Sequence, residues 1–296
     1  MNVKSGALLL AVVLLTSAVG VQSARGQLSE RAPGLSEQTA KAVAPVKMFD
    51  NMYYVGLDFV CAYVIKTSEG LILVDTLYVP FENHTIDSIR QLGMDPKDIK
   101  YVIISHGHDD HYAGALAVKA AAPQARFMMS EADYDLMEKT FKSGKNGTAK
   151  GIVSRDLVAK EGDTLTLGDT TLKLHLTPGH TPGVISFEMP VYDNGRKYNL
   201  FYWAGPTLQS NQLPVMEQFQ ATTRRLQAEF TNVDVMIHSH PWSVSLIDKV
   251  EKARNRKPGD PNPFVNPREF QEFMASRIVD TDKRMAAVKA KEAARQ

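Results

Sequence analysis

The spacing of hydrophobic residues divides the first half of the chain into short strands and helices. Segments 51–55, 59–66 and 71–75 combine β-branched and aromatic residues between glycine-containing turns, which predicts three strands. Apolar positions three or four residues apart predict a helix over 81–92. The continuous apolar run at 101–104 is typical of a strand buried near the centre of a sheet.

The second half repeats this mixture of strands and helices. Further strands are predicted at 126–129, 164–167, 171–176, 184–189, 200–203 and 233–237, and further helices over 112–122, 130–141, 216–230 and 268–296. Mixed elements in two halves of similar order predict an α/β (α+β) fold class. The architecture we expect is an αββα sandwich of two mixed β-sheets flanked by helices.

The first residues are typical of a secretory signal. Lys4 precedes the apolar run 7–15, and small residues near Ser23 offer a cleavage point, which predicts a signal peptide over residues 1–23. A membrane anchor is the alternative, but the apolar run is short for a bilayer span. We therefore expect a periplasmic protein with no stable membrane anchor after cleavage.

Composition bounds the remaining chain. The 296 residues are 44% hydrophobic and 23% charged, with a net charge of +1, as in an ordinary globular protein that has no electrostatic reason to bind nucleic acid. The single cysteine, Cys61, excludes an intrachain disulfide bond. After the signal peptide, the chain is predicted to divide into a flexible N-terminal arm over 24–45, a domain over 46–256 and a C-terminal loop and helix over 257–296.

The densest group of metal-binding side chains is a His-x-His-x-Asp-His run that directly follows the predicted strand at 101–104. We expect this run to form a loop. His106 and His108 stand two residues apart and can bind one ion from the same side. Asp110 and His111 are adjacent and can turn toward a second ion. The run therefore predicts four ligands of a two-metal site.

Tetrahedral zinc needs further ligands from elsewhere in the chain. His180 is fixed between Pro178 and Pro182 and is expected to complete a three-histidine set. His240 follows a buried strand and is expected to complete a second set with the aspartate. His238 is its rival two residues away, and His240 is preferred because the strand should end before the ligand.

Asp75 is predicted to support the site from behind. It ends the predicted strand at 71–75, and a metal-bound imidazole needs an acceptor for its other ring nitrogen. A turn cap is the alternative role for this side chain. Asp109 has no assignable ligand partner and is predicted to be solvated, and His84 and His175 are predicted to be structural.

Two zinc ions per chain would share a hydroxide, because metal coordination lowers the pKa of water to about 7. Iron or manganese would fit the same donors. The sequence contains neither a G-x-S-x-G nucleophile motif nor a phosphate-binding glycine loop. The chemistry predicted from these residues is hydrolysis of a carbonyl or phosphoryl compound.

These motifs resemble those of the metallo-β-lactamase superfamily. The resemblance spans about 46–246 and is carried by 73–76, 106–111, 177–183 and 240–241. It implies the αββα sandwich, with a zinc site at one edge of it. The superfamily's lactonase-like and glyoxalase-II-like branches carry a metal-bridging aspartate after a late strand, and one β-lactamase branch carries a cysteine there.

Gly205 and Pro206 stand at that position here. The chain is therefore most similar to subclass B3 of the β-lactamases, which implies three histidines for one zinc ion and Asp110, His111 and His240 for the other. The implied function is a periplasmic zinc-dependent hydrolase that opens the amide of β-lactam antibiotics by attack of a metal-bridging hydroxide. Asp110 would orient that hydroxide as the catalytic residue.

One feature departs from subclass B3. Serines that help to hold the antibiotic's carboxylate are replaced by Pro206 and Leu208, with Thr207 nearby. Another ester, lactone or thioester as substrate is thus an alternative, and a non-catalytic metal-binding protein is a second one. The partner is expected to be a small molecule, the oligomeric state is left open, and the candidate pocket walls, for which core packing is the other explanation, are Phe59, Tyr78, Thr207 and Trp242.

Overall fold

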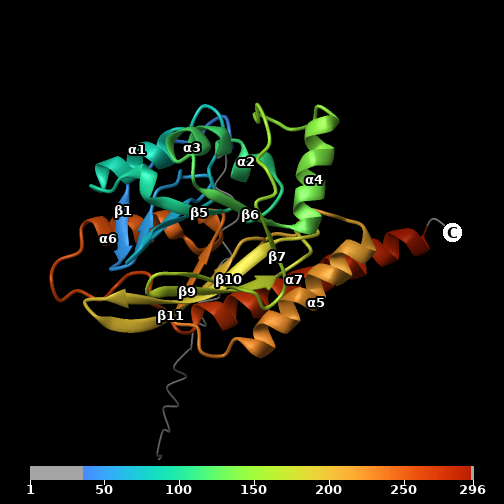
Figure 1. Cartoon of the computed structure of the whole chain (residues 1–296). Helices are drawn as coiled ribbons and strands as arrows, with labels where there is room; N and C mark the ends of the chain where they lie inside the picture. Colours follow the sequence, from blue (N-terminus) through green and yellow to red (C-terminus); the bar gives the residue numbers. More distant parts are fainter. Residues whose placement is uncertain (1–35, 295–296) are drawn as a thin grey trace, which may run out of the picture.

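Two β-sheets lie face to face, and helices cover their outer faces (Figure 1). This arrangement confirms the predicted αββα sandwich. The computed structural model describes residues 36–294, so the predicted signal peptide lies outside the described residues. Of the predicted arm over 24–45, the described part contacts the domain through a bridge between Ala42 and Leu57.

The first sheet has seven strands in sequence order, β1-β2-β3-β4-β5-β6-β7. Its strands are β1 (Val46–Phe49), β2 (Met52–Tyr54), β3 (Tyr63–Thr67), β4 (Gly70–Val74), β5 (Ile99–Ile103), β6 (Arg126–Ser130) and β7 (Leu157–Ala159). Pairing is antiparallel from β1 to β4 and parallel from β4 to β7. The carboxyl ends of β4, β5 and β6 therefore meet at one edge, where the segments after them lie close together.

The second sheet has five strands in the order β12-β11-β10-β9-β8. These are β8 (Thr164–Leu167), β9 (Thr170–Leu176), β10 (Ile185–Asp193), β11 (Arg196–Trp203) and β12 (Val235–His238). β10 and β11 form a long antiparallel hairpin, whereas β12 runs parallel to β11. Because β11 and β12 are parallel, the segments after Trp203 and His238 leave the sheet at the same edge.

Helices cover both outer faces (Figure 1). The helical elements are α1 (His84–Gln91), η1 (Pro96–Asp98), α2 (Asp109–Tyr112), α3 (Ala115–Ala121), α4 (Glu131–Lys142), α5 (Leu213–Glu229), η2 (Pro241–Val244), α6 (Leu246–Arg254) and α7 (Glu269–Ala293). The C-terminal helix α7 packs along α5, where the Gln220 Nε2 donates to the Ile278 carbonyl at 3.2 Å. Among residues 36–294, no helix has the length and apolar character that a bilayer crossing requires.

Two local predictions are wrong. The strand predicted over 59–66 begins at Tyr63, because the residues before it turn back on themselves through a 2.8 Å hydrogen bond from Leu57 N to Val60 O. The ligand run expected as a loop enters the short helix α2 at Asp109. That turn places Asp110 and His111 on a helix instead of an open loop.

Candidate metal centre

Three separate segments bring the predicted ligands to one edge of the sandwich. The segment after β5 carries His106 and His108, and α2 follows it directly. His180 lies in the turn between β9 and β10, and His240 lies just after β12. The parallel pairs β4–β5 and β11–β12 place the ends of both sheets at this edge.

His106, His108 and His180 form one set, named here the three-histidine group. One ring nitrogen from each lies within 4.8 Å of the others. His180 Nε2 is 3.1 Å from His108 Nδ1, close to the roughly 3.3 Å expected between two nitrogens bound to one tetrahedral zinc ion. The three side chains thus converge on one point.

Asp110, His111 and His240 form a second set, named here the aspartate group. Their donor atoms also lie within 4.8 Å of one another. The Asp110 Oδ2 is 3.4 Å from His111 Nε2 and 3.7 Å from His240 Nε2. The structure places His240 in this set, whereas the rival His238 is fully buried and hydrogen-bonds to the Trp203 carbonyl at 3.0 Å.

A buried carboxylate orients one ligand of the aspartate group. Asp75 is fully buried, and its Oδ2 accepts a 2.8 Å hydrogen bond from His111 Nδ1. The same carboxylate accepts from Ser105 N at 2.7 Å, from Ser105 Oγ at 2.8 Å and from the Tyr202 hydroxyl at 3.2 Å. Asp75 therefore makes the contact expected of it, and it fixes His111 with Nε2 directed at the site.

Carbonyl oxygens orient two further ligands. His180 Nδ1 donates to Thr207 O at 2.7 Å, and His240 Nδ1 donates to Phe59 O at 2.8 Å. Each bond fixes the tautomer that leaves Nε2 free to bind a metal ion. The residue sequence gave no sign of these partners, because a carbonyl oxygen is present at every position.

Burial makes most of these histidines neutral. Desolvation, aided by nearby histidines, lowers the pKa of His180 to about 3, and desolvation lowers the pKa of His108 and of His240 to about 4. His111 differs, because Asp110 and Asp75 outweigh the effect of burial and raise its pKa to about 9. Neutral imidazoles are the form that binds metal ions, so the three-histidine group is ready for a cation.

The six residues fit a pair of divalent metal ions. The Nε2 atoms of His106 and His111 are buried without a hydrogen-bond partner among the described residues, as expected of atoms that bind an ion. Imidazole and carboxylate are also the donors that zinc takes in catalytic sites. When bound there, such ions would supply Lewis acidity.

Comparison with known proteins places the chain in a family. A sequence model of the metallo-β-lactamase superfamily matches residues 55–193. The crystal structure of BJP-1, a subclass B3 metallo-β-lactamase of Bradyrhizobium japonicum, is 35% identical, with a TM-score of 0.75 over 84% of this chain and 96% of that one. The chain belongs to the metallo-β-lactamase superfamily. This confirms the resemblance drawn from the sequence motifs.

Other proteins are similar to the chain over different lengths. FEZ-1, a metallo-β-lactamase from Legionella gormanii, is 25% identical, with a TM-score of 0.76 over 83% of this chain and 97% of that one. The N-acyl homoserine lactonase AttM of Agrobacterium fabrum (strain C58) is 37% identical over 109 residues, 34% of this chain and 40% of that protein. YobT of Bacillus subtilis (strain 168) is 28% identical over 42% of this chain and 54% of that protein. The chain thus matches only about half or less of these last two relatives.

The four candidate pocket walls lie in different surroundings. The Phe59 ring centroid is 5.6 Å from that of His240 and 5.1 Å from that of Trp242, so both aromatic residues border the aspartate group. Thr207 borders the three-histidine group through its carbonyl oxygen. Tyr78 is 2% exposed and packs against Phe81 in the core, the other explanation given for it.

The other polar predictions have mixed outcomes. Asp109 is half-buried and accepts a 3.0 Å hydrogen bond from Thr148 N, so the prediction that it is solvated is wrong. His84 hydrogen-bonds to the Gly56 carbonyl at 3.1 Å, and His175 lies between two glutamates, which agrees with structural roles for both.

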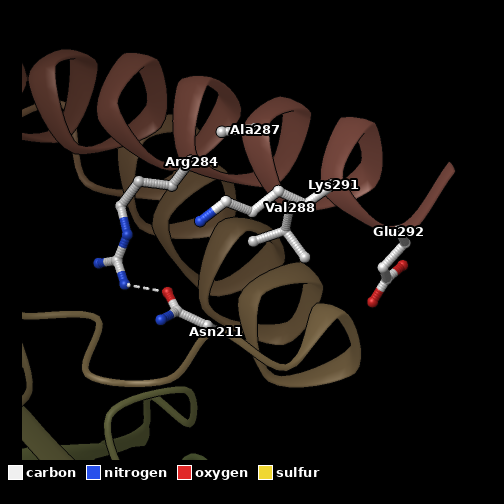
Figure 2. A pocket seen from close by; sticks show the side chains of 6 residues that line it. All are labelled: Asn211, Arg284, Ala287, Val288, Lys291 and Glu292. Carbon is white, nitrogen blue, oxygen red and sulfur yellow. Dashed lines mark hydrogen bonds between the residues drawn. The ribbon is translucent and has the colours of Figure 1, made fainter. Parts of the chain in front are cut away.

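The segment after β11, residues 205–212, is held from the C-terminal helix. Arg284 of α7 donates to the carbonyls of Leu208 and Ser210 at 2.6 and 3.3 Å. It also donates to Asn211 Oδ1 at 3.1 Å, the contact drawn in Figure 2, where both residues line an open pocket beside α7. Arg284 therefore fixes the path of the segment whose Thr207 carbonyl orients His180.

Proposed function

We propose that the chain hydrolyses β-lactams with two zinc ions, one held by the three-histidine group and one by the aspartate group. The observation that carries the proposal is this complete six-residue set in a chain similar to BJP-1 over 96% of that β-lactamase. FEZ-1, similar over 97% of its length, is also a metallo-β-lactamase. Full-length similarity of this kind favours a β-lactam over the substrates of relatives that match only in part.

Zinc ions bound at these positions would polarise a carbonyl group and lower the pKa of water to about 7. The chain supplies the positioning of the donors and one base. Asp110 is the single carboxylate among the six residues, and 11% of its side chain is exposed. We assign to its carboxylate the role of orienting the attacking water and accepting its proton.

The segment after β11 supports a β-lactamase more than a lactonase. In the lactonase-like branches of the superfamily an aspartate follows a glycine here, whereas in this chain Pro206 follows Gly205. Proline has no carboxylate that could bridge two ions. The second ion would therefore depend on His240 in place of a bridging carboxylate.

Hydrolysis of a lactone is the second candidate. AttM of Agrobacterium fabrum is an N-acyl homoserine lactonase, and it is 37% identical over the part that matches. Pro206 and Leu208 are buried and carry no hydroxyl group to hold the carboxylate of a β-lactam. Both observations favour a substrate without that carboxylate.

A substrate panel separates the two candidates. Zinc-loaded protein is given nitrocefin, a carbapenem and an N-acyl homoserine lactone, and bound metal is measured in the same preparation. We expect β-lactam opening that EDTA removes and added zinc restores, and an Asp110→Asn variant that loses the activity. Turnover of the lactone alone would establish the second candidate, and turnover of neither would leave a metal-binding protein or a hydrolase for another ester.

We further propose that residues 1–23 direct the chain to the periplasm, where a β-lactamase meets its substrate. The apolar run at 7–15 after Lys4 supports this. Expression of the full chain followed by cell fractionation and N-terminal sequencing tests it. A mature protein that begins near Ala24 in the periplasmic fraction is expected, whereas an uncleaved cytoplasmic chain would contradict it.

A further inference from the structure

Asp133, in the first turn of α4, has a buried carboxylate that the proposed mechanism does not use. Its side chain is fully buried. The Oδ2 accepts hydrogen bonds from Gly107 N at 3.1 Å and from Thr181 Oγ1 at 2.6 Å, and the Oδ1 accepts from Gly183 N at 3.0 Å. Both oxygens therefore act only as acceptors.

The three donors belong to the two segments that carry the three-histidine group. Gly107 lies between His106 and His108, and Thr181 directly follows His180. These segments come from different sheets, after β5 and after β9. One carboxylate thus joins the two backbone segments whose separation decides whether three histidines can reach one ion.

Two glycines let α4 approach both segments closely. A Cβ atom at Gly107 would lie 2.8 Å from Asp133 O, and one at Gly183 would lie 2.9 Å from Asp133 N. Real Cβ atoms essentially never come so near to backbone atoms. Any side chain at either position would push the first turn of α4 away from the segment, so the glycines and the carboxylate together set the spacing.

The carboxylate is ionised at neutral pH. Burial raises the pKa of Asp133 to about 6, although the Thr181 hydroxyl and the two glycine N–H groups lower it. An ionised carboxylate offers acceptors to all three donors. An asparagine of the same shape would turn an NH₂ group toward one of them and lose that hydrogen bond.

We propose that Asp133 is a positioning residue that sets the spacing of the three-histidine group and, through it, the affinity of that group for a metal ion. The inference rests on the proposed metal binding by His106, His108 and His180. It does not extend to the aspartate group, because His111 is oriented by Asp75 and His240 by the Phe59 carbonyl.

Zinc affinity is the measurement that tests this role. Metal-free protein is titrated with Zn²⁺ in competition with a chromophoric chelator, which resolves two binding steps in the parent protein. The Asp133→Asn variant should bind one of the two ions about 10–100-fold more weakly, the range expected when a partner of a ligand is lost. The other step should stay within about threefold of the parent value.

Asp156→Asn is the matched control. Asp156 also accepts from a backbone N–H, that of Phe127 at 2.9 Å, and from a hydroxyl, that of Ser154 at 2.7 Å. It does so at the opposite end of β6 from Asp133. Both zinc steps should be unchanged in this variant. Equal weakening in both variants would mean general loosening of the fold and would overturn the proposal.

Ligand variants show which ion is affected. In a His180→Ala background, where the three-histidine group is already broken, Asp133→Asn should cost no further affinity for the remaining ion. In a His240→Ala background, Asp133→Asn should still lower the zinc affinity of the three-histidine group about 10–100-fold. The reverse pattern would overturn the proposal. A parent protein that binds no zinc would instead refute the proposed function, so the two failures are distinguishable.

Two variants at Thr181 test the same role of Asp133 if Asp133→Asn does not fold. Thr181→Val keeps the shape of the side chain but removes one donor to the carboxylate. Thr181→Ser keeps the donor. We expect weaker zinc binding in the valine variant and parent-like binding in the serine variant, and equal affinities in the two would contradict the role of Asp133.

Discussion

The two ligand groups lie side by side at one edge of the sandwich, but they are supported in different ways. In the aspartate group, His111 is tied to the carboxylate of the fully buried Asp75. In the three-histidine group, His180 is tied to the neutral carbonyl oxygen of Thr207. The first support is a side chain that a mutation removes, and the second is backbone that follows the fold.

The two groups also differ in whether charge or the spacing of the side chains is expected to determine metal binding. Asp110 and Asp75 make the aspartate group electronegative, and they raise the pKa of His111 to about 9. The three-histidine group has no carboxylate among its ligands, and its binding strength must come from the spacing of neutral rings. Changes of charge among the ligands and Asp75 should therefore act mainly on the aspartate group, and changes of spacing mainly on the three-histidine group.

Removing a ligand should give the largest effects on activity. The stability of the metal-free fold should then differ between a variant of the aspartate group and a variant of the three-histidine group. His111→Ala and His180→Ala are each expected to lower kcat/KM more than about 100-fold, because either change leaves an ion with two protein ligands. His111→Ala should also destabilise the metal-free fold by about 3 kcal/mol, since the buried Asp75 carboxylate keeps its neutral donors but loses its charged partner. Urea denaturation of both variants without metal tests this, and equal stabilities would contradict it.

Asp75→Asn should give the next largest effect. The amide is a weaker acceptor for His111 Nδ1, so zinc affinity of the aspartate group should fall about 10–100-fold. The three-histidine group should change less, because Asp75 reaches it only through Ser105, whose Oγ is 3.1 Å from His106 Nδ1. Competition titration with zinc resolves the two binding steps. Equal losses of zinc affinity in both steps would contradict the difference in support between the two groups.

The pH dependence of stability should differ in sign between the three-histidine group and His111. The folded-state pKa is about 4 for His108 and about 3 for His180, below the ordinary 6.5. Between these pH values the histidines bind protons in the unfolded chain but not in the folded protein. The free energy of unfolding should therefore fall as the pH drops from about 6.5 toward 4. His111 stabilises the fold below about pH 6.5, and this contribution is lost as the pH rises through about 9.

Denaturation of EDTA-treated protein across this range measures both limbs of the profile. His180→Ala should flatten the acid limb, and His111→Ala should flatten the alkaline limb. A profile that is level between about pH 5 and pH 7 would contradict the neutral state of the three-histidine group.

Thr207→Ala should give the smallest effect. Its carbonyl oxygen, which orients His180, stays in place when the side chain is shortened. We expect zinc affinity within about threefold of the parent value, in contrast to Asp75→Asn. A loss as large as that of Asp75→Asn would show that the Thr207 hydroxyl, 3.2 Å from His180 Nδ1, is the true support.

The sequence predicted the parts of the site that depend on residue type. Histidine and aspartate at short spacing after a buried strand indicated four ligands, and the proline frame of His180 indicated a fifth. It did not predict that Asp133 joins two distant ligand segments. That role depends on how α4 lies across the edge of both sheets, and in the sequence Asp133 is only one residue of the helix predicted over 130–141.

The fold was predicted in outline for a similar reason. Alternation and helical spacing give the elements, and the resemblance to a family gave their arrangement. Short elements were missed where long-range bonds override local pattern. Cys61 looked like a strand residue, but its N–H donates to Ser239 O at 2.8 Å, outside the strand ladder.

The hydrogen bonds from Arg284 to residues 205–212 have a consequence for which substitutions this segment can accept. Two of its three partners are carbonyl oxygens, those of Leu208 and Ser210, which every amino acid carries. A change of side chain at the half-buried Ser210 therefore leaves the acceptor of this hydrogen bond in place. The segment can vary at such a position while Arg284 keeps its path, and with it the Thr207 carbonyl that orients His180.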